Sequence, residues 1–233
     1  MSDTTAPAAH VAARLHAVND AIAAAAARHG RAAGSVALVA VSKRQPAAAI
    51  RAAHAAGQRR FGENYLQEAL AKQDELADLD LEWHFIGAIQ SNKTADIAAR
   101  FDWVHTVDRE KIARRLNDQR PAGRAPLEVL VEVNISGEAS KHGVTPQALP
   151  ALLETLAALP RLRLRGLMAL PAPAAEVAAQ RRAFAALAAL AAASPVPLDT
   201  LSMGTSDDFE AAIAEGATLV RIGTAVFGPR PRD

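Results

Sequence analysis

Hydrophobic residues along this chain fall into short unbroken blocks, and each block is followed by a longer segment with helical spacing. The first clear block is VALVAV over 36–41, which ends in the polar pair Ser42 and Lys43. Unbroken apolar, β-branched runs of this length are typical of strands buried on both faces, as in parallel sheets. Pro46 stands where a helix would begin, and the alanine-rich segment after it continues to Gly57. The pattern predicts a buried strand followed by a helix.

The same pattern repeats to the end of the chain. It predicts eight strands, over 36–43, 59–64, 81–88, 102–107, 127–136, 162–170, 199–204 and 218–228. Helices are predicted between them, over 46–57, 65–76, 91–101, 108–117, 145–159, 175–193 and 206–216. Strict alternation implies right-handed crossovers and a parallel sheet, and eight repeats in 233 residues imply a closed (β/α)8 barrel of the TIM type. An open doubly wound sheet is the alternative, but no Gly-x-Gly-x-x-Gly follows the first strand to support it.

The segment before the first strand predicts one further helix, over about 5–29, because Gly30 and Gly34 follow it as stop signals. Charged residues interrupt this helix, so it does not resemble a signal peptide, and no stretch approaches the roughly 18 apolar residues of a membrane span. We therefore expect a single domain over 1–233, with its barrel over about 36–228, in a cytoplasmic protein.

Composition excludes several classes of protein. The chain has 26 basic and 25 acidic residues and a net charge of +1, which argues against a general electrostatic affinity for nucleic acid or anionic membranes. It has no cysteine, so disulfide scaffolds, thiolate metal sites and cysteine nucleophiles are excluded. The seven histidines include no His-x-His or His-x-x-x-His pair, so no metal site is expected. His84 and His105 fall within predicted strands, where we expect hydrogen-bonded interior histidines.

Polar residues and glycines gather at the predicted carboxyl ends of the strands, where parallel barrels carry their active sites. Lys43 is the most informative of them, because it ends an apolar strand at the barrel mouth. Desolvation lowers the pKa of a lysine, and a neutral amine attacks carbonyl carbons, so one interpretation is a Schiff-base lysine. Position alone favours the other interpretation, an ordinary strand-end lysine that extends to water.

Two glycine-bearing segments near the C-terminus change that balance. Ser202 and Gly204 lie at the end of the seventh predicted strand, and Gly223 and Thr224 follow the eighth. Barrels often bind phosphate in these two loops, where glycine lets the backbone approach an anion closely. Together with Lys43, the loops predict a site for pyridoxal phosphate, in which the lysine holds the aldehyde carbon and the loops hold the phosphate.

Several long stretches closely resemble the YggS/PROSC family of pyridoxal phosphate homeostasis proteins. They are VAVSKRQPAAAIRAAHAAGQRRFGENYLQEAL, WHFIGAIQSNK, LRGLMAL and LSMGTSDDFEAAIAEGATLVRIGTAVFG, which lie between about Val36 and Gly228. The resemblance implies the fold of the alanine racemase N-terminal barrel, fold type III among pyridoxal phosphate proteins, without a C-terminal β domain. It also implies pyridoxal 5'-phosphate as the cofactor, bound as a Schiff base.

The resemblance assigns roles to individual residues. Lys43 would carry the cofactor, Asn64 would lie beside it, and Arg221 would face the pyridine nitrogen. Four more residues would serve the phosphate, namely Ser202, Gly204, Gly223 and Thr224. An alternative for Arg221 is an ion pair at the barrel mouth with an acid such as Glu63.

Two departures from the family pattern are visible. Thr205 stands where the family commonly has the second methionine of Ser-Met-Gly-Met-Ser, and Gly87-Ala88 stands where it commonly has Gly-Pro. Neither departure touches the residues assigned above. Of the other lysines, Lys93 is predicted to be a solvated lysine at a helix start. Lys141 lies in a polar loop that either folds over the barrel mouth or stays exposed.

The same residues argue against strong catalysis. Arginine stays protonated, so Arg221 would keep the ring nitrogen unprotonated and the cofactor a poor electron sink. A racemase of this fold also needs a second acid/base group, which the related racemases take from a tyrosine of their C-terminal domain. The only tyrosine here is Tyr65. We expect a protein that holds pyridoxal phosphate and delivers it, with apo-enzymes as recipients. The alternatives are an amino-acid racemase, and a barrel that binds a phosphorylated metabolite without a covalent bond.

Overall fold

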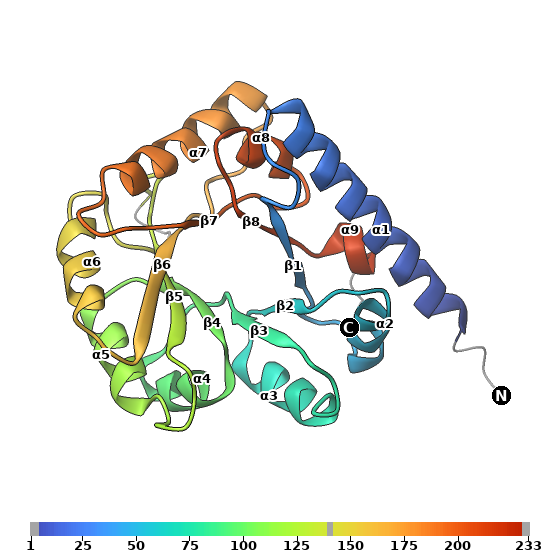
Figure 1. Cartoon of the computed structure of the whole chain (residues 1–233), viewed down its shortest axis with the longest axis horizontal. Helices are drawn as coiled ribbons and strands as arrows, with labels where there is room; N and C mark the ends of the chain where they lie inside the picture. The colour runs from blue at the N-terminus through green and yellow to red at the C-terminus, as the bar shows by residue number, and fades with distance from the viewer. Residues whose placement is uncertain (1–4, 139–141, 230–233) are drawn as a thin grey trace.

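The eight strands of the protein close into one barrel in which each strand runs parallel to its neighbours in chain order (Figure 1). This computed structural model describes residues 5–138 and 142–229. The strands are β1 (Ala37–Val41), β2 (Arg60–Glu63), β3 (Glu82–Phe85), β4 (Trp103–Val107), β5 (Leu127–Glu132), β6 (Leu162–Met168), β7 (Thr200–Ser202) and β8 (Leu219–Ile222). The (β/α)8 barrel predicted from the alternating pattern is confirmed.

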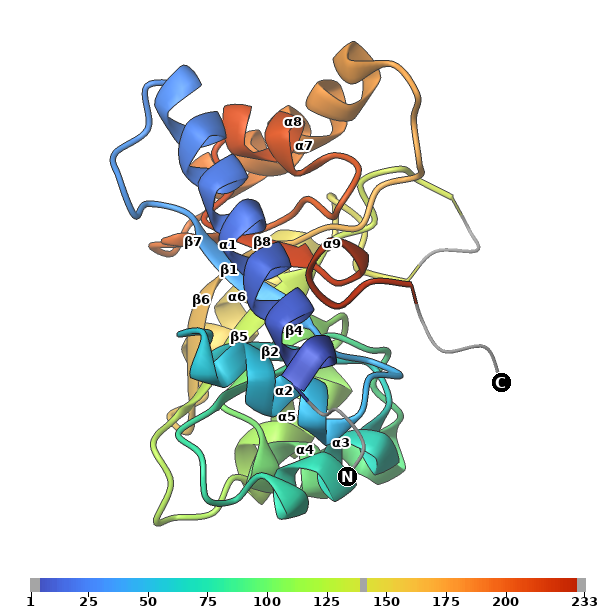
Figure 2. The same cartoon turned by 90° about the vertical axis from the view of Figure 1, so that its right-hand side faces the viewer.

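Helices surround the strands (Figure 1). They are α1 (Thr5–Arg28), α2 (Ala47–Ala55), α3 (Leu66–Glu75), the 3-10 helix η1 (Ser91–Lys93), α4 (Thr94–Arg100), α5 (Glu110–Gln119), α6 (Leu149–Ala157), α7 (Val177–Ala192), α8 (Phe209–Ala214) and α9 (Thr224–Phe227). The α1 helix precedes the barrel and packs along α2, α8 and α9 (Figure 2). Among the described residues, no helix is long and apolar enough to cross a membrane.

Two strands end at least four residues earlier than the apolar pattern predicts. β5 ends at Glu132, because the amide of Asn134 then bonds to the carbonyl of Val144 in the next loop. β8 ends at Ile222, and the apolar run after it forms α9, in which the amide of Phe227 donates to the carbonyl of Gly223. Phe227 is buried, so its hydrophobic character reflects packing outside the sheet.

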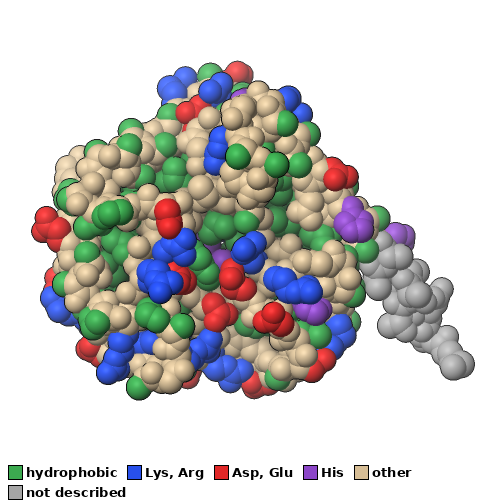
Figure 3. All heavy atoms as spheres, viewed as in Figure 1, with side chains coloured by type: hydrophobic (Ala, Val, Ile, Leu, Met, Phe, Trp, Pro, Cys, Tyr) green, Lys and Arg blue, Asp and Glu red, His purple; other side chains and the backbone are tan. Residues whose placement is uncertain are grey.

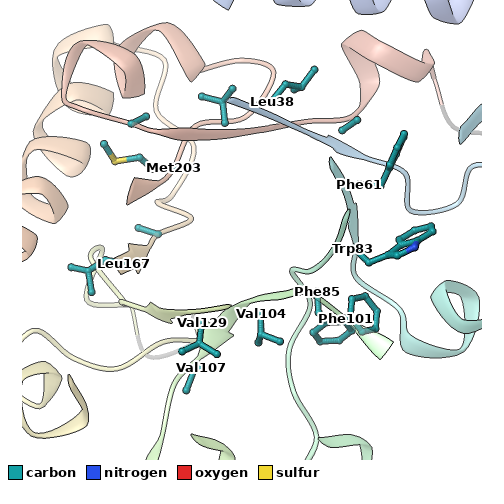
Figure 4. Packing of buried hydrophobic residues seen from close by; sticks show 14 of the residues in the cluster. Leu38, Phe61, Trp83, Phe85, Phe101, Val104, Val107, Val129, Leu167 and Met203 are labelled. Atoms are coloured by element: carbon teal, nitrogen blue, oxygen red, sulfur yellow. The ribbon is translucent and has the colours of Figure 1, made fainter. Parts of the chain in front are cut away.

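Side chains along the strands alternate between two environments. Trp83 and Phe85 belong to the apolar cluster between barrel and helices, where the rings of Phe85 and Phe101 pack edge to face (Figure 4). His84, between the two, is fully buried and hydrogen-bonded to His105. Hydrogen-bonded interior histidines were predicted at both positions, and the structure confirms them.

Basic and acidic side chains are intermingled on the surface. Figure 3 shows both signs side by side around the centre of one face. Among the described residues, Arg165 pairs with both Glu128 and Asp199, and Arg60 pairs with Glu82. Opposite charges at this spacing cancel one another's field, in keeping with the net charge of +1.

Candidate functional site

The carboxyl ends of the strands surround a cavity of about 630 Å³. Lys43 follows β1, Asn64 follows β2, Arg221 belongs to β8, and Gly223 and Thr224 follow β8. All five line the cavity, so the structure brings together five of the seven residues singled out from the sequence. Its polar lining also includes Glu132, Thr205, Ser206 and Asp207, and its apolar lining includes Val41, Ile86, Met168, Leu170 and Ala225.

Lys43 lies on a turn whose backbone is held from both sides. Ser42, just before it, is fully buried and donates from its hydroxyl to Glu63 Oε1 at 2.6 Å. Arg44, just after it, has a φ of +58°, which non-glycine residues adopt rarely, and its amide donates to a carboxylate oxygen of Glu68. The lysine therefore projects from a rigid, strained turn at the cavity wall.

A buried ion cluster ties that turn together. Lys72 Nζ donates to the carbonyl of Ser42 at 2.7 Å, to Glu63 Oε1 at 2.7 Å and to Glu68 Oε1 at 2.6 Å. Burial raises the pKa of Glu63 above its ordinary value, although the nearby Lys72 opposes that shift. Glu63 is engaged by Lys72 and Ser42, so it is not the partner of Arg221 that the sequence left open.

Asn64 carries an unused acceptor. Its Nδ2 donates to the carbonyl of Ile86 at 3.5 Å, while its Oδ1 is buried without a hydrogen-bond partner among the described residues. A Cβ added to Gly87 would lie 2.1 Å from the carbonyl oxygen of Asn64, so only glycine lets that loop pass. Thr106 Oγ1 fixes the loop by donating to the carbonyl of Gly87 at 2.6 Å. A buried orphan amide oxygen beside a cavity is a contact that a ligand can complete.

Arg221 is the buried cation of the site. Its Nη1 donates to Ser202 Oγ at 2.7 Å, and its Nη2 donates to the carbonyl of Ala169 at 3.0 Å. Burial lowers the pKa of Arg221 to about 10, while the carboxylates of Glu132 and Asp208 act in the opposite direction. Arg221 is therefore a cation at neutral pH, held in place by two neutral acceptors.

Ser202 and Gly204 lie next to the cavity without being among the residues that line it. Ser202 is fully buried, and its Oγ is shared between Arg221 and His105 Nδ1, the latter at 2.9 Å. Gly204 has a φ of +92°, and a Cβ there would lie 2.6 Å from that of Ala212. Glycine is therefore required for the turn after β7, and the carbonyl of Gly204 accepts from the amide of Arg221 at 3.0 Å.

Gly223 lets β8 approach the end of β1. A Cβ at Gly223 would lie 3.0 Å from the carbonyl oxygen of Val41 and 3.3 Å from its Cβ. Thr224 follows in the cavity lining, and Ser206 lines it from the loop after β7. The lining thus includes the hydroxyls of Ser206 and Thr224 and the bare backbone of Gly223, a donor set that suits a phosphate.

The sequence did not single out Glu132. Its burial raises the pKa of this carboxyl, and the negative charge of Asp108 adds to the shift. The signal that could have identified it was the end of the fifth strand, which was predicted at 136, four residues beyond its end at Glu132. In the structure Asn134 Nδ2 donates to the carbonyl of Glu138 at 2.8 Å, and Asn134 does not line the cavity.

Three further residues considered from the sequence are Lys93, Lys141 and Tyr65. Lys93 ends η1 and is not among the lining residues, and Lys141 lies outside the described residues. Tyr65, at the start of α3, is 49% exposed and faces the guanidinium of Arg44 at 5.9 Å. Within residues 5–138 and 142–229 no group of three or more histidine or acidic side chains is placed to hold a metal ion.

Comparisons with a family model and with the sequences of known proteins agree with one another. The family model described as the alanine racemase N-terminal domain matches residues 16–231. A pyridoxal phosphate homeostasis protein of Pseudomonas aeruginosa is 67% identical over 201 residues, covering 86% of this chain and 87% of that protein. Its counterpart in Escherichia coli is 54% identical over 227 residues, covering 94% and 97%.

Solved structures show the same relationship. PipY of Synechococcus elongatus with pyridoxal phosphate bound superposes with a TM-score of 0.80 at 41% identity, covering 94% of this chain and all of that one. Alanine racemase from Corynebacterium glutamicum superposes with a TM-score of 0.67 at 21% identity, covering 94% of this chain and 62% of that one. The second likeness shows a shared fold alone.

Proposed function

Because the chain belongs to the alanine racemase N-terminal domain family, and within it to the pyridoxal phosphate homeostasis proteins, we propose that it binds pyridoxal 5'-phosphate covalently through Lys43 and delivers it to apo-enzymes. The observation that carries the proposal is the joint position of Lys43 and Arg221 on one cavity, at the ends of the adjacent strands β1 and β8. A primary amine and a fixed cation that line the same cavity suit the aldehyde and the ring nitrogen of one cofactor.

The cavity also has the remaining donors and acceptors that this cofactor needs. Its hydroxyls, from Ser206 and Thr224, and the bare backbone of Gly223 suit the phosphate. Asn64 Oδ1 is a buried acceptor still without a partner among the described residues. The aldehyde, the ring nitrogen and the phosphate of pyridoxal phosphate therefore each have a matching group in the lining, and Asn64 offers one further acceptor.

When bound, pyridoxal phosphate supplies an electrophilic aldehyde carbon and an electron-accepting pyridine ring. Lys43 would attach at the aldehyde carbon, from a turn that Lys72 and Glu68 hold rigid. Arg221 would donate to the ring nitrogen and exclude a proton from it, because a guanidinium has no acceptor. Without that proton the ring stabilises carbanions poorly, which supports a role in holding the cofactor over one in catalysis.

Ser202 and Gly204, two of the residues predicted to bind the phosphate, do not line the cavity and would instead position residues that do. Ser202 would orient Arg221 through their 2.7 Å hydrogen bond, and Gly204 would allow the turn that presents Ser206. Thr205 replaces the methionine common in the family, and its Oγ1 bonds to Asp208 Oδ1 at 3.0 Å. This substitution changes the rim of the cavity and leaves the proposed covalent residue unchanged.

Reduction with borohydride tests the covalent attachment. The protein loaded with pyridoxal phosphate should absorb in the imine region, and peptide mass spectrometry after reduction should find the label on Lys43. Lys43→Ala should lose the band and keep the native circular dichroism spectrum, whereas the matched variant Lys93→Ala should keep both. A label on Lys93 or Lys141 would overturn the assignment, and a site without any imine band would favour non-covalent binding of a phosphorylated metabolite.

A further inference from the structure

A row of hydrogen-bonded side chains runs through the inside of the barrel. Glu82 Oε1 contacts His84 Nε2 at 2.8 Å, and His84 Nδ1 contacts His105 Nε2 at 2.8 Å. His105 Nδ1 contacts Ser202 Oγ at 2.9 Å, which in turn contacts Arg221 Nη1 at 2.7 Å. The row joins β3, β4, β7 and β8 and ends at the cavity that holds Lys43.

The far end of the row lies at the opposite mouth of the barrel. Glu82 is the first residue of β3 and borders a cleft of about 470 Å³ that Asp102, Glu128 and Arg165 also line. Its carboxylate is 37% exposed there and pairs with Arg60 at 3.0 Å. The row thus connects a carboxylate in contact with water to a guanidinium at the floor of the cavity.

The chemistry of the end groups fixes the direction of every bond. An ionised carboxylate only accepts, so His84 carries its proton on Nε2 and accepts at Nδ1. His105 must then donate from Nε2 and accept at Nδ1. Ser202 donates its hydroxyl proton to His105 and accepts from Arg221, which has donors only. Each hydrogen-bonding atom in the row is satisfied in this one arrangement.

Burial keeps the middle of the row neutral. Both imidazoles are fully buried, and desolvation lowers the pKa of His84 and, more strongly, that of His105. Burial alone would raise the pKa of Glu82, but the hydrogen bond from His84 and the charge of Arg60 lower it below its ordinary value. The row is therefore a carboxylate and a guanidinium joined by three neutral groups.

The dipoles of those neutral groups all point the same way. Each presents an acceptor atom toward Arg221 and a donor hydrogen toward Glu82. Both end charges are stabilised by this alignment, and hydrogen bonds in such chains polarise one another. Among the described residues, Ser202 provides the only side chain that accepts a hydrogen bond from the Arg221 guanidinium, and the carbonyl of Ala169 is its other acceptor. The row therefore supplies one of the two hydrogen bonds that orient the guanidinium.

We propose that Ser202, His105 and His84 are positioning residues that fix the Arg221 guanidinium from within the barrel, with Glu82 setting the direction of the whole row. The consequence for the cofactor rests on the proposed function, because Arg221 acts there on the ring of pyridoxal phosphate. The direction of the hydrogen bonds in the row does not rest on the proposed function, since that direction is a property of the protein without a ligand.

Long-range proton–nitrogen correlation spectra of the cofactor-free protein test that direction. At neutral pH both His84 and His105 should carry their proton on Nε2. An Nδ1-protonated ring or an imidazolium at either position would overturn the proposal, whatever the protein binds.

A substitution at the far end is a sharper test. Glu82→Gln keeps the shape of the side chain, but its amide both donates and accepts, so the bias on His84 is removed. The Nδ1-protonated form should then appear at His84 and also at His105, which Glu82 does not contact. The matched control is Glu128→Gln, in the same cleft, which should leave both rings unchanged. Unchanged spectra in Glu82→Gln would show that the row is not directed from Glu82.

A double-mutant cycle tests the effect on the cofactor. Ser202→Ala and His105→Gln should each raise the dissociation constant for pyridoxal phosphate by roughly 3- to 10-fold, the range that corresponds to one hydrogen bond. Because both act through Arg221, the double variant should bind no more weakly than the weaker single variant. Independent, multiplying effects would refute the positioning role. Absence of pyridoxal phosphate from the unaltered protein would instead refute the proposed function and leave the spectra to decide on the row.

Discussion

Lys72 and Glu63 form an ion pair 2.7 Å long that is buried on both sides, with side-chain exposures of 8% and 0%. The same ammonium donates to the carbonyl of Ser42, the residue before Lys43. Charges this deep are stable only while each has its partner, since a lone buried charge is not solvated. The position of the proposed cofactor lysine thus depends on a residue of α3 nine positions after the end of β2.

Replacing Lys72 should therefore destabilise the protein more than its distance from the cavity suggests. Lys72→Met leaves Glu63 buried without its cation, which should lower the free energy of unfolding by about 3–5 kcal/mol in urea titrations. Glu63→Gln added to Lys72→Met should recover part of that loss. Glu110→Gln, which breaks the exposed pair with Arg114, is the control and should change stability by less than about 1 kcal/mol. Equal losses of stability in Lys72→Met and Glu110→Gln would contradict a buried network around Lys72.

Cofactor retention should respond more to Gly223 than to Ser202. Gly223→Val places a side chain against the carbonyl and Cβ of Val41, so the end of β1 must shift just before Lys43. Ser202→Ala removes hydroxyl hydrogen bonds and leaves the backbone in place. We expect at least a tenfold larger rise in the dissociation constant for Gly223→Val, measured by dialysis and absorbance. Comparable retention by both variants would argue against a phosphate beside β8.

Acid should unfold the protein partly through the interior histidines. Burial lowers the pKa of His105 well below 6.5, so the folded state keeps this ring neutral while the unfolded state protonates it. The unfolded state then binds more protons below pH 6.5, and stability must fall as the pH falls through that range. His105→Gln removes this contribution, so the stability difference between variant and unaltered protein should shrink by up to about 1.4 kcal/mol per pH unit below 6.5.

Ser202→Ala is the control for that experiment. It breaks the same row of hydrogen bonds but removes no titrating group, so its stability difference should stay nearly constant over the same pH range. Urea titrations at pH 5, 6 and 7 measure both variants. A constant difference for His105→Gln as well would mean that His105 titrates alike in the folded and unfolded states.

The strand–helix alternation was enough to predict the barrel, because unbroken apolar blocks such as 36–41 have few other interpretations. Strand boundaries were harder to predict from the sequence. Phe227 continues an apolar run, yet it packs in α9, and β8 ends at Ile222. Interior hydrogen-bonded histidines were predicted at His84 and His105, but their connection into a row from Glu82 to Arg221 was not. Its members come from four strands, and only the barrel's closure brings His105 and Ser202 within 2.9 Å.

The holding and racemase interpretations differ most clearly in proton exchange at the α-carbon. A racemase needs a positioned acid/base on each side of that carbon, and each such group contributes roughly 10²- to 10⁴-fold. Tyr65 is half exposed and is not among the described residues that line the cavity, and Arg221 in its proposed role would withhold a proton from the cofactor ring. We therefore expect the loaded protein to give negligible deuterium exchange into alanine by NMR, and to restore activity to an apo-enzyme that needs pyridoxal phosphate.

Glu132, a buried carboxyl with a raised pKa in the cavity lining, is the residue to examine if exchange is seen. Robust exchange that persists in Tyr65→Phe and disappears in Glu132→Gln would assign the acid/base role to Glu132, whereas loss in Tyr65→Phe would assign it to the tyrosine. Either result would contradict the expectation of negligible exchange and favour the racemase interpretation.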